Sequence, residues 1–415
     1  MQINVSSSHN IDGTLILPLF EGTDIVPEAH ATGMHVALKA QINRVLADGD
    51  FKGKPKSTMS LVGSEGGKAM LVGLGKEDDA DVHAYRKAGA AVVAARKKTH
   101  GTDLTVRFAG ASIECMGAFA EGMLLRDYSY DEYKMQKEED KEAERSVRIT
   151  CDEGQEEDLQ ALVNIHSGVA SGVHLSRDLG NCPPNDMYPE AFSDMAWEWA
   201  KQYDNVDVTI INYEHAMKAG MGGLVAVGMG SSRKPCMVIF EMNKELPGRC
   251  PLLVGKGITF DTGGISLKPG ANMDEMKYDM GGSATVFGTM QALASTGYDG
   301  KVVGITCMAE NMPAETHNAL VTLSQRSLVR PLKFSTPTLK ADWFSPMDCG
   351  RLVNSILNSS STLQPSPVLA LSLSVTKLQD CGPTMMTSEP RFTKQETLLT
   401  NWLGQCRFYQ PSKRK

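Results

Sequence analysis

The sequence has little of what marks a membrane protein or a nucleic-acid-binding protein. No apolar run approaches the roughly 18 residues that a membrane-spanning helix needs. Lysine and arginine together number 42 against 49 aspartates and glutamates, so the formal net charge is −7. Phosphate backbones repel an acidic chain, which argues against nucleic acid as the main partner. We therefore expect neither a membrane nor a nucleic acid to be a partner of this protein.

The first ten residues also lack the signals of an exported or imported protein. They contain no basic segment ahead of an apolar run and no arginine-rich amphipathic pattern, so no signal or transit peptide is evident. The nine cysteines have neither metal-site nor disulfide spacing, and their odd number suits a reducing compartment. These observations favour the cytoplasm, with the mitochondrion as the alternative if a presequence precedes this start.

The 415 residues are enough for two domains, each with its own core. Residues 1–145 are expected to form a small α/β domain, with strands at 14–20, 69–74 and 103–108 and a helix at 82–98. Residues 146–180 are expected to be a linker and a connecting helix, the helix covering 158–175. The charge run at 136–148 is typical of a solvated turn or linker.

Residues 181–370 are expected to form the second domain, in which strands alternate with helices. The strands are expected at 207–211, 237–240, 251–254 and 302–307, and a helix at 190–202. Such alternation predicts a doubly wound, mainly parallel sheet. The fold class is therefore α/β, with a small N-terminal α/β domain and a C-terminal doubly wound domain. Residues 371–415 remain unassigned.

The most informative stretch is residues 252–283, where a buried strand gives way to glycine, lysine and aspartate. Four charged residues stand out in it: Lys256, Asp261, Lys268 and Asp279. In open α/β sheets, ligands bind beyond the carboxyl ends of the strands. Lysines and aspartates in a glycine-rich loop are more often simply solvated. A phosphate-binding loop is disfavoured, because no Gly-x-x-x-x-Gly-Lys-Ser/Thr pattern is present. The density of charged residues favours a catalytic site.

This stretch resembles the leucyl aminopeptidases, the cytosol-type exopeptidases with two metal ions. It contains Val-Gly-Lys-Gly-x-x-Phe-Asp-x-Gly-Gly, then Lys-Pro, then Met-x-x-Asp-Met-Gly-Gly, in the order found in that family. The similarity extends back through residues 220–224 and 177–186, and it ends at about residue 313.

The resemblance implies a function, a cofactor and roles for the four charged residues. Family members hydrolyse the N-terminal, leucine-like residue of peptides with two divalent ions, Mn²⁺ or Zn²⁺, and assemble as hexamers. By resemblance, Lys256 and Asp279 bind one metal ion and Asp261 bridges both. Lys268 is implied to polarise the substrate carbonyl. The N-terminal domain carries no catalytic residue in this family, and the second domain is the catalytic one.

After Pro313 the chain departs from the family pattern. The motif Asn-Thr-Asp-Ala-Glu-Gly-Arg, which supplies the remaining metal ligands in the family, is absent, and residues 336–342 read Thr-Pro-Thr-Leu-Lys-Ala-Asp. Codons for those residues, read one nucleotide earlier, can encode the missing motif. The same shift recovers two further family motifs from residues 319–323 and 364–369. Our hypothesis is a single-nucleotide frame change near Pro313 that persists to at least residue 369.

Two readings of the chain follow. In the first, it is a metallo-aminopeptidase of this family whose activity is impaired, because half of the metal ligands are missing. In the second, it is an inactive paralogue with a structural or binding role. Either reading predicts at most one weakly held metal ion, bound by Lys256, Asp261 and Asp279, and leaves the hexamer in doubt.

Overall fold

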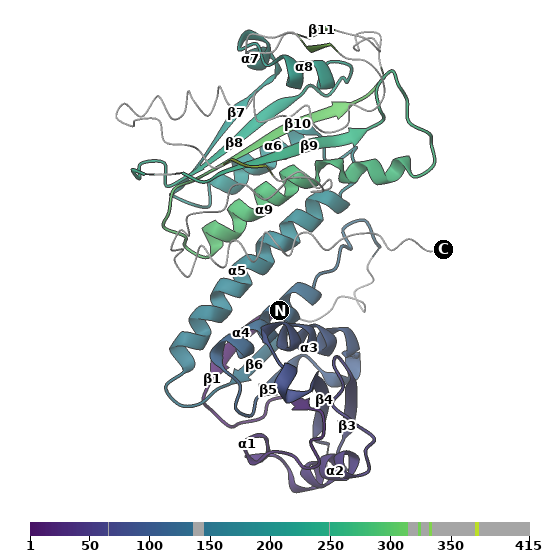
Figure 1. Ribbon diagram of the computed structural model, residues 1–415, viewed down its shortest axis with the longest axis vertical. Coiled ribbons are helices and arrows are strands. Elements are labelled where there is room, and N and C mark those ends of the chain that lie inside the picture. Colours follow the sequence, from purple (N-terminus) through teal and green to yellow (C-terminus); the bar gives the residue numbers. More distant parts are fainter. Residues whose placement is uncertain are drawn as a thin grey trace. The chain divides into compact units, whose positions relative to one another are not determined.

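The computed structural model describes residues 1–64, 66–135, 145–248 and 250–313, with the backbone of 323–324, 332–333 and 370–372 (Figure 1). The chain divides into two compact units, Met1–Ala170 and Ser171–Lys415. Most of the charge run at 136–148 lies outside the described residues. So do residues 336–342 and 364–369, on which the frame-change hypothesis depends.

The first unit is built on a six-stranded sheet in the order β1-β6-β5-β2-β4-β3. The strands are β1 (Gln2–Ser6), β2 (Thr14–Phe20), β3 (Thr58–Val62), β4 (Lys68–Gly75), β5 (Asp103–Arg107) and β6 (Ser146–Thr150). All neighbours are parallel except β3 and β4. The predicted strands at 14–20, 69–74 and 103–108 are confirmed as β2, β4 and β5. Residues 146–150, expected in the connecting segment, form β6 and pair with both β1 and β5.

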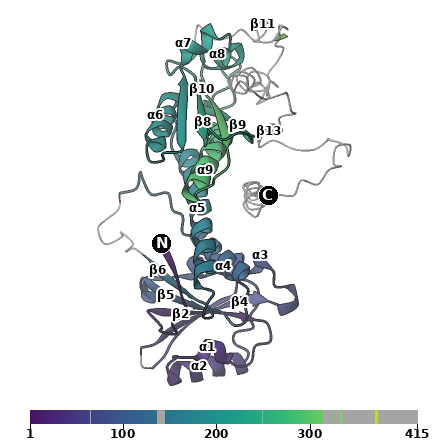
Figure 2. The ribbon, with the colours of Figure 1, turned by 90° about the vertical axis from the view of Figure 1, so that its left-hand side faces the viewer.

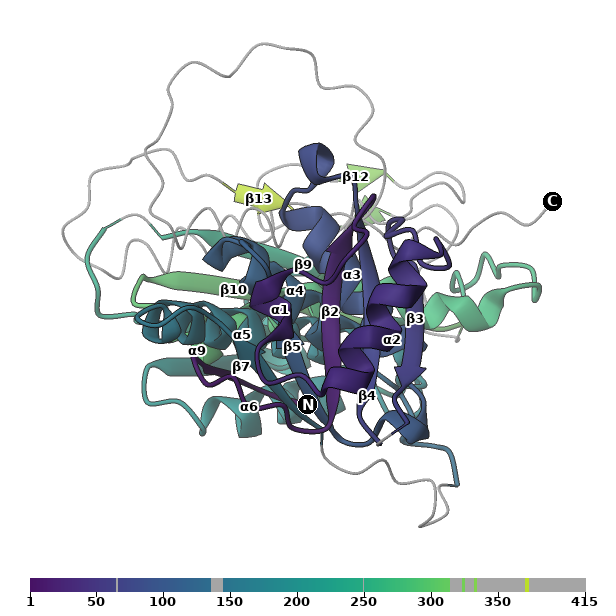
Figure 3. The same ribbon diagram turned by 90° about the horizontal axis from the view of Figure 1, so that it is seen from below.

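Helices cover both faces of this sheet (Figure 2). They are α1 (Glu28–Ala31), α2 (Val36–Ala47), α3 (Val82–Ala95) and α4 (Ile113–Arg126), with short 3₁₀ turns at Glu77–Asp79 and Lys98–His100. One core lies under α3 and α4. Helices α1 and α2 lie on the other face of the sheet (Figure 3), and the core there contains Leu38 and Ile42 with Leu15 and Leu71. The helix predicted at 82–98 ends at Ala95, because Arg96 has an extended ψ of 137°.

A buried arginine and a buried histidine lie together in the first unit. Arg107, at the end of β5, donates hydrogen bonds to the backbone carbonyls of His9, His30 and Thr32. The His30 side chain is buried, and neither of its ring nitrogens has a hydrogen-bond partner among the described residues. Burial lowers the pKa of His30 to about 4, and the charge of Arg107 acts in the same direction.

We therefore expect the first unit to lose stability as the pH falls from about 6.5 to about 4. In this range the unfolded chain binds a proton at His30 and the native chain does not, so acid favours unfolding. The free energy of unfolding is expected to be about 3 kcal/mol lower at the lower end of this pH range than at its upper end. Urea titrations monitored by circular dichroism at several pH values would measure it. His30→Leu should flatten this dependence, and replacement of the exposed His215 is the control. An unchanged pH dependence in His30→Leu would contradict the assignment.

The second unit is built on a five-stranded sheet in the order β13-β9-β10-β8-β7. The strands are β7 (Val206–Ile211), β8 (Cys236–Met242), β9 (Leu252–Asp261), β10 (Val302–Asn311) and β13 (Ala370–Ser372). Only β8 runs against the others, so the predicted mainly parallel sheet is confirmed. A separate two-stranded ladder joins β11 (Leu323–Ser324) and β12 (Leu332–Lys333). The four strands expected from the sequence correspond to β7, β8, β9 and β10.

Helices of this unit also lie on both faces of the sheet. They are α5 (Glu156–Asn181), which begins in the first unit, α6 (Pro189–Ala200), α7 (Tyr213–Lys218), α8 (Gly222–Gly228) and α9 (Gly281–Ser295), with a 3₁₀ segment η4 (Met273–Met280). In β8, Val238 and Phe240 face the core under α6 and α9, while Met237 and Ile239 face α7 and α8. The helices predicted at 158–175 and 190–202 are confirmed as α5 and α6. None of the helices within the described ranges is long and apolar enough to span a membrane.

Helices α5 and α9 touch backbone to backbone in the second unit. A side chain at Gly288 would collide with the Ser176 hydroxyl and the Gly172 carbonyl, so only glycine fits there. The Ser176 hydroxyl also donates a hydrogen bond of 2.9 Å to the Ala284 carbonyl. This close packing fixes α9, whose first turn lies beside β9.

Candidate functional site

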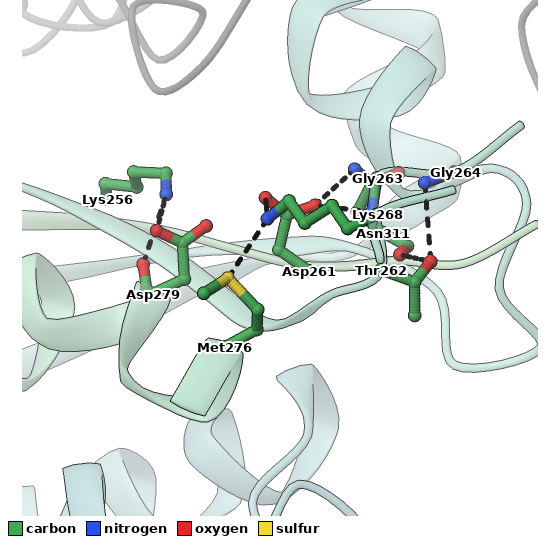
Figure 4. Close-up of polar contacts among 9 residues, drawn as sticks. All are labelled: Lys256, Asp261, Thr262, Gly263, Gly264, Lys268, Met276, Asp279 and Asn311. Carbon is green, nitrogen blue, oxygen red and sulfur yellow. Dashed lines mark hydrogen bonds and ion pairs between the residues drawn. The ribbon is translucent and has the colours of Figure 1, made fainter. Parts of the chain in front are cut away.

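The four charged residues predicted from the sequence lie at the carboxyl end of β9 and in the connection that follows it (Figure 4). Lys256 is within β9, Asp261 is its last residue, Lys268 is in the following loop, and Asp279 is in η4. The structure joins them as two ion pairs, Lys256 with Asp279 and Lys268 with Asp261.

Asp261 is the most firmly held of the four. Its Oδ2 lies 2.5 Å from Lys268 Nζ, and its Oδ1 accepts hydrogen bonds from Asn311 Nδ2 at 2.6 Å and from Gly263 N at 3.0 Å. Burial raises the pKa of Asp261, but the hydrogen bond and charge of Lys268 outweigh it, and the net pKa lies below its ordinary value. Asp261 is therefore a carboxylate at neutral pH.

Asp279 is in a less stabilising environment. It forms the ion pair with Lys256 Nζ, which also lies 3.4 Å from the Asp279 carbonyl. Burial raises the pKa of Asp279 above its ordinary value, and the charge of Lys256 only partly opposes this.

Lys268 Nζ lies 3.1 Å from Met276 Sδ, and Figure 4 shows Met276 between the two ion pairs. The lysines thus neutralise both carboxylates.

Asn311, which the sequence did not single out, contacts the charged cluster. It ends β10 and lies directly opposite Asp261 in the parallel register of β9 and β10. Its carbonyl accepts hydrogen bonds from Thr262 N at 3.0 Å and Thr262 Oγ1 at 2.7 Å, so Asn311 holds both residues at the end of β9. A polar residue ending the neighbouring parallel strand is the signal that could have identified it.

Two features of the chain shape the loop and bring α9 up to Lys256. Gly263 has a φ of +90°, and a side chain there would collide with the Ser266 carbonyl. A side chain at Gly282 would lie 2.7 Å from Lys256 N, so glycine lets the first turn of α9 approach β9. The positive end of the α9 dipole is therefore next to the charged cluster.

A metal ion needs more donors than these residues offer. Within the described ranges, no three His, Cys, Asp or Glu side chains are grouped so that they could hold a metal ion. The cluster supplies two carboxylates, each paired with an ammonium group. Two dications would be far from neutralised by this set. The described residues do not by themselves fit a two-metal centre, and they offer at most three ligands for one ion.

Comparison with known proteins covers both units. Residues 16–137 match the N-terminal domain of the cytosol aminopeptidase family, and residues 174–320 match its catalytic domain. A probable cytosol aminopeptidase of Stutzerimonas stutzeri is 36% identical over 311 residues, 72% of this chain and 62% of that protein. The cytosol aminopeptidase of Pseudomonas aeruginosa is 35% identical over 311 residues, again 72% and 62%. The chain thus spans about 62% of the length of these curated relatives.

Solved structures show the same fold. The bottromycin maturation enzyme BotP in complex with Mn superposes with a TM-score of 0.69 at 25% identity, covering 88% of this chain and 73% of that one. A mutant of tomato leucine aminopeptidase superposes with a TM-score of 0.71 at 23% identity, covering 86% and 72%. The similarity to the tomato enzyme shows a shared fold and nothing more.

Proposed function

The chain belongs to the cytosol aminopeptidase family, and from this premise we propose that it is a metallo-aminopeptidase acting on the N-terminal residue of peptides. The observation that carries the proposal is the charged cluster at the carboxyl end of β9. All four of its residues lie within the part of the chain that matches the family's catalytic domain. The preference for leucine-like N-terminal residues is part of the proposal.

The proposed cofactor is a divalent metal ion, Mn²⁺ or Zn²⁺. Lys256, Asp261 and Asp279 are the proposed ligands, with the Lys256 amine neutral when the ion is bound. A bound ion would supply an activated water and polarise the peptide carbonyl. The Mn complex of BotP, a structural relative, supports the choice of manganese.

Lys268 is the proposed catalytic cation. Its backbone N–H donates to the Thr262 carbonyl at 2.9 Å, and its Nζ is held by Asp261, so its position is fixed from both ends. A fixed ammonium group can donate to the peptide oxygen as negative charge develops there. The side chain is 23% exposed, which leaves room for a substrate atom to approach.

We propose further that turnover in this chain is impaired, because the family motif with the remaining ligands is absent after Pro313. Peptides are the proposed substrates and the cytoplasm is the proposed location, with the mitochondrion as the alternative. A homo-hexamer is the assembly expected of the family. Sedimentation or light scattering would decide whether this chain forms it, and smaller species or aggregates are expected if its C-terminal part is frame-shifted.

Metal content gives a first test of the proposed site. Dialysed protein should contain well under two equivalents of Mn²⁺ or Zn²⁺ per chain by elemental analysis, because the described cluster offers at most three ligands. Asp261→Asn should abolish what is bound, while Asp207→Asn, which alters an exposed ion pair on β7, is the control. Two tightly held ions per chain would contradict the partial site.

The activity itself is tested with a leucyl peptide and the same peptide acetylated at its N-terminus. An impaired aminopeptidase should release leucine slowly, from the free peptide only, and only with Mn²⁺ or Zn²⁺ present. Cleavage of both peptides would contradict the proposed function. Specific peptide binding without any turnover would instead favour the inactive paralogue.

A further inference from the structure

Arg233, in the segment between α8 and β8, contacts three separate parts of the second unit. Its guanidinium donates hydrogen bonds to the Pro184 carbonyl at 2.8 Å and to the Asn185 carbonyl at 3.1 Å. It also lies over the Tyr188 ring, 4.3 Å from the ring centroid. Its NH1, the nitrogen that donates to Pro184, also lies 3.6 Å from Glu310 Oε1. These contacts attach the loop at 181–185 to the carboxyl end of β10.

The Glu310 end of this connection is buried. Glu310 is 7% exposed, and its Oε2 accepts a hydrogen bond of 2.5 Å from the Ser231 hydroxyl. A buried carboxylate needs such partners. Glu310 directly precedes Asn311, whose side chain holds Asp261. Arg233 therefore contacts the residue next to Asn311, and Asn311 orients the Asp261–Lys268 pair.

The other end of this segment, Asn181 at the end of α5, contacts η4 next to the second ion pair. The Asn181 carbonyl accepts a hydrogen bond of 2.9 Å from Lys277 Nζ, and Asn181 Oδ1 accepts one of 3.0 Å from the Tyr278 hydroxyl. Lys277 and Tyr278 directly precede Asp279 in η4. The loop therefore holds the segment that carries Asp279, the partner of Lys256.

We propose that Arg233 is a positioning residue, which sets the Lys256–Asp279 pair relative to the Asp261–Lys268 pair through the loop at 181–185. Its planar guanidinium can bridge two carbonyls and a carboxylate at once, which a lysine cannot do. The distance between the two ion pairs matters for catalysis only under the proposed function, because a metal ion bound by groups of both pairs requires those ligands at a set separation.

The test uses the full chain with Arg233→Ala and needs no turnover. Amide hydrogen exchange over residues 273–280 is expected to accelerate about tenfold, because the loop that holds η4 loses its charged donor. Acylation of the Lys256 and Lys277 amines should accelerate as well. The rate at Lys268 should stay unchanged, because Asp261 holds that amine independently of the loop. Lys244→Ala is the matched control, since Lys244 pairs with Asp207 at the opposite end of the sheet.

Two further variants separate positioning from a general loss of stability. Arg233→Lys should give an intermediate effect at η4, because a single ammonium nitrogen can replace only part of the contacts made by the two guanidinium nitrogens. Asn181→Ala removes the Oδ1 that accepts from Tyr278 at the other end of this connection, while the carbonyl that accepts from Lys277 remains. The double variant with Arg233→Ala should therefore accelerate exchange by less than the product of the two single changes. If Arg233→Ala does not fold, Arg233→Lys and Asn181→Ala carry the test alone.

Two results would overturn the inference. The first is that amide exchange at residues 273–280 is unchanged in every variant. The second is that exchange becomes faster throughout β8 and β10 and that Lys268 is acylated as fast as Lys256. This second result would indicate that Arg233 has a purely structural role. Because exchange and labelling report on the ion pairs directly, their outcome is independent of whether the chain proves to be an aminopeptidase.

Discussion

Correcting the reading frame after Pro313 is expected to raise hydrolysis of a leucyl peptide by more than about 10²-fold. Loss of residues that merely support metal ligands typically costs roughly 10–100-fold, and the absent motif supplies ligands themselves. In the corrected chain, the motif Asn-Thr-Asp-Ala-Glu-Gly-Arg would replace residues 336–342, placing carboxylates where Thr338 and Lys340 stand and an arginine in place of Asp342. The second metal ion then gains anionic ligands, and the Lys256, Asp261 and Asp279 set becomes half of a complete centre.

The measurement compares the original and corrected chains under the same conditions, with Mn²⁺ or Zn²⁺ in excess. The original chain should be close to background and bind well under two metal ions, whereas the corrected chain should bind two. The acetylated peptide serves as the control for aminopeptidase specificity. Equal activity of both chains would show that the missing motif has been assigned incorrectly. Inactivity of both would favour the paralogue with a binding role.

Support for this prediction comes from where the similarity ends. The match to the family's catalytic domain stops at residue 320, shortly after Pro313. The curated relatives align over 311 residues, which is 72% of this chain but only 62% of their own length. The charged cluster precedes that point, as do β9, which carries part of it, and β10, which ends at Asn311. The nucleotide sequence around codon 313 would be the most direct evidence for or against a frame change.

The sequence predicted strand positions better than it predicted strand lengths and pairings. β9 was expected to stop at residue 254, because glycines follow, yet it continues to Asp261. Gly255 pairs with Thr306 of β10, and glycine is needed there because a side chain would lie 2.6 Å from the Gly282 carbonyl of α9. β6 has a local strand signal, because Ser-Val-Arg-Ile-Thr alternates polar and apolar residues, but the charge run that precedes it masks this signal. Its pairing with β1 and β5 is long-range and is not visible in the local sequence.

The charged cluster was found from its motif, but its supporting residues were not. Asn311 contacts Asp261 only because β9 and β10 are parallel neighbours in this register, which composition does not reveal. Arg233 is still less visible, since the carbonyls it contacts lie 49 and 48 residues away in the chain. Residue types that carry chemistry can be recognised locally, whereas the groups that orient them depend on the tertiary fold.

Lys268→Met in the frame-corrected chain is expected to lower kcat by about 10²- to 10³-fold with little change in KM. This is the usual cost of removing one preorganised donor that stabilises developing charge. Methionine keeps an unbranched apolar side chain of similar length beside Met276, so packing is largely retained. The change removes the ammonium group that lies 2.5 Å from Asp261 Oδ2. Asp261 then keeps Asn311 and Gly263 as its hydrogen-bond partners.

Metal binding should respond in the opposite direction to turnover. With no cation competing for its carboxylate, Asp261 should bind Mn²⁺ at least as tightly in Lys268→Met as in the parent, while hydrolysis falls. Lys268→Ala is the companion variant. If the charge of Lys268 is what matters, Lys268→Ala and Lys268→Met should lose the same activity. If packing is what matters, Lys268→Met should retain most of the activity that Lys268→Ala loses. Steady-state kinetics and Mn²⁺ titration on the same preparations give both readouts. Loss of metal together with activity would show that Lys268 supports the metal site, and would contradict its role as the group that stabilises the substrate oxygen.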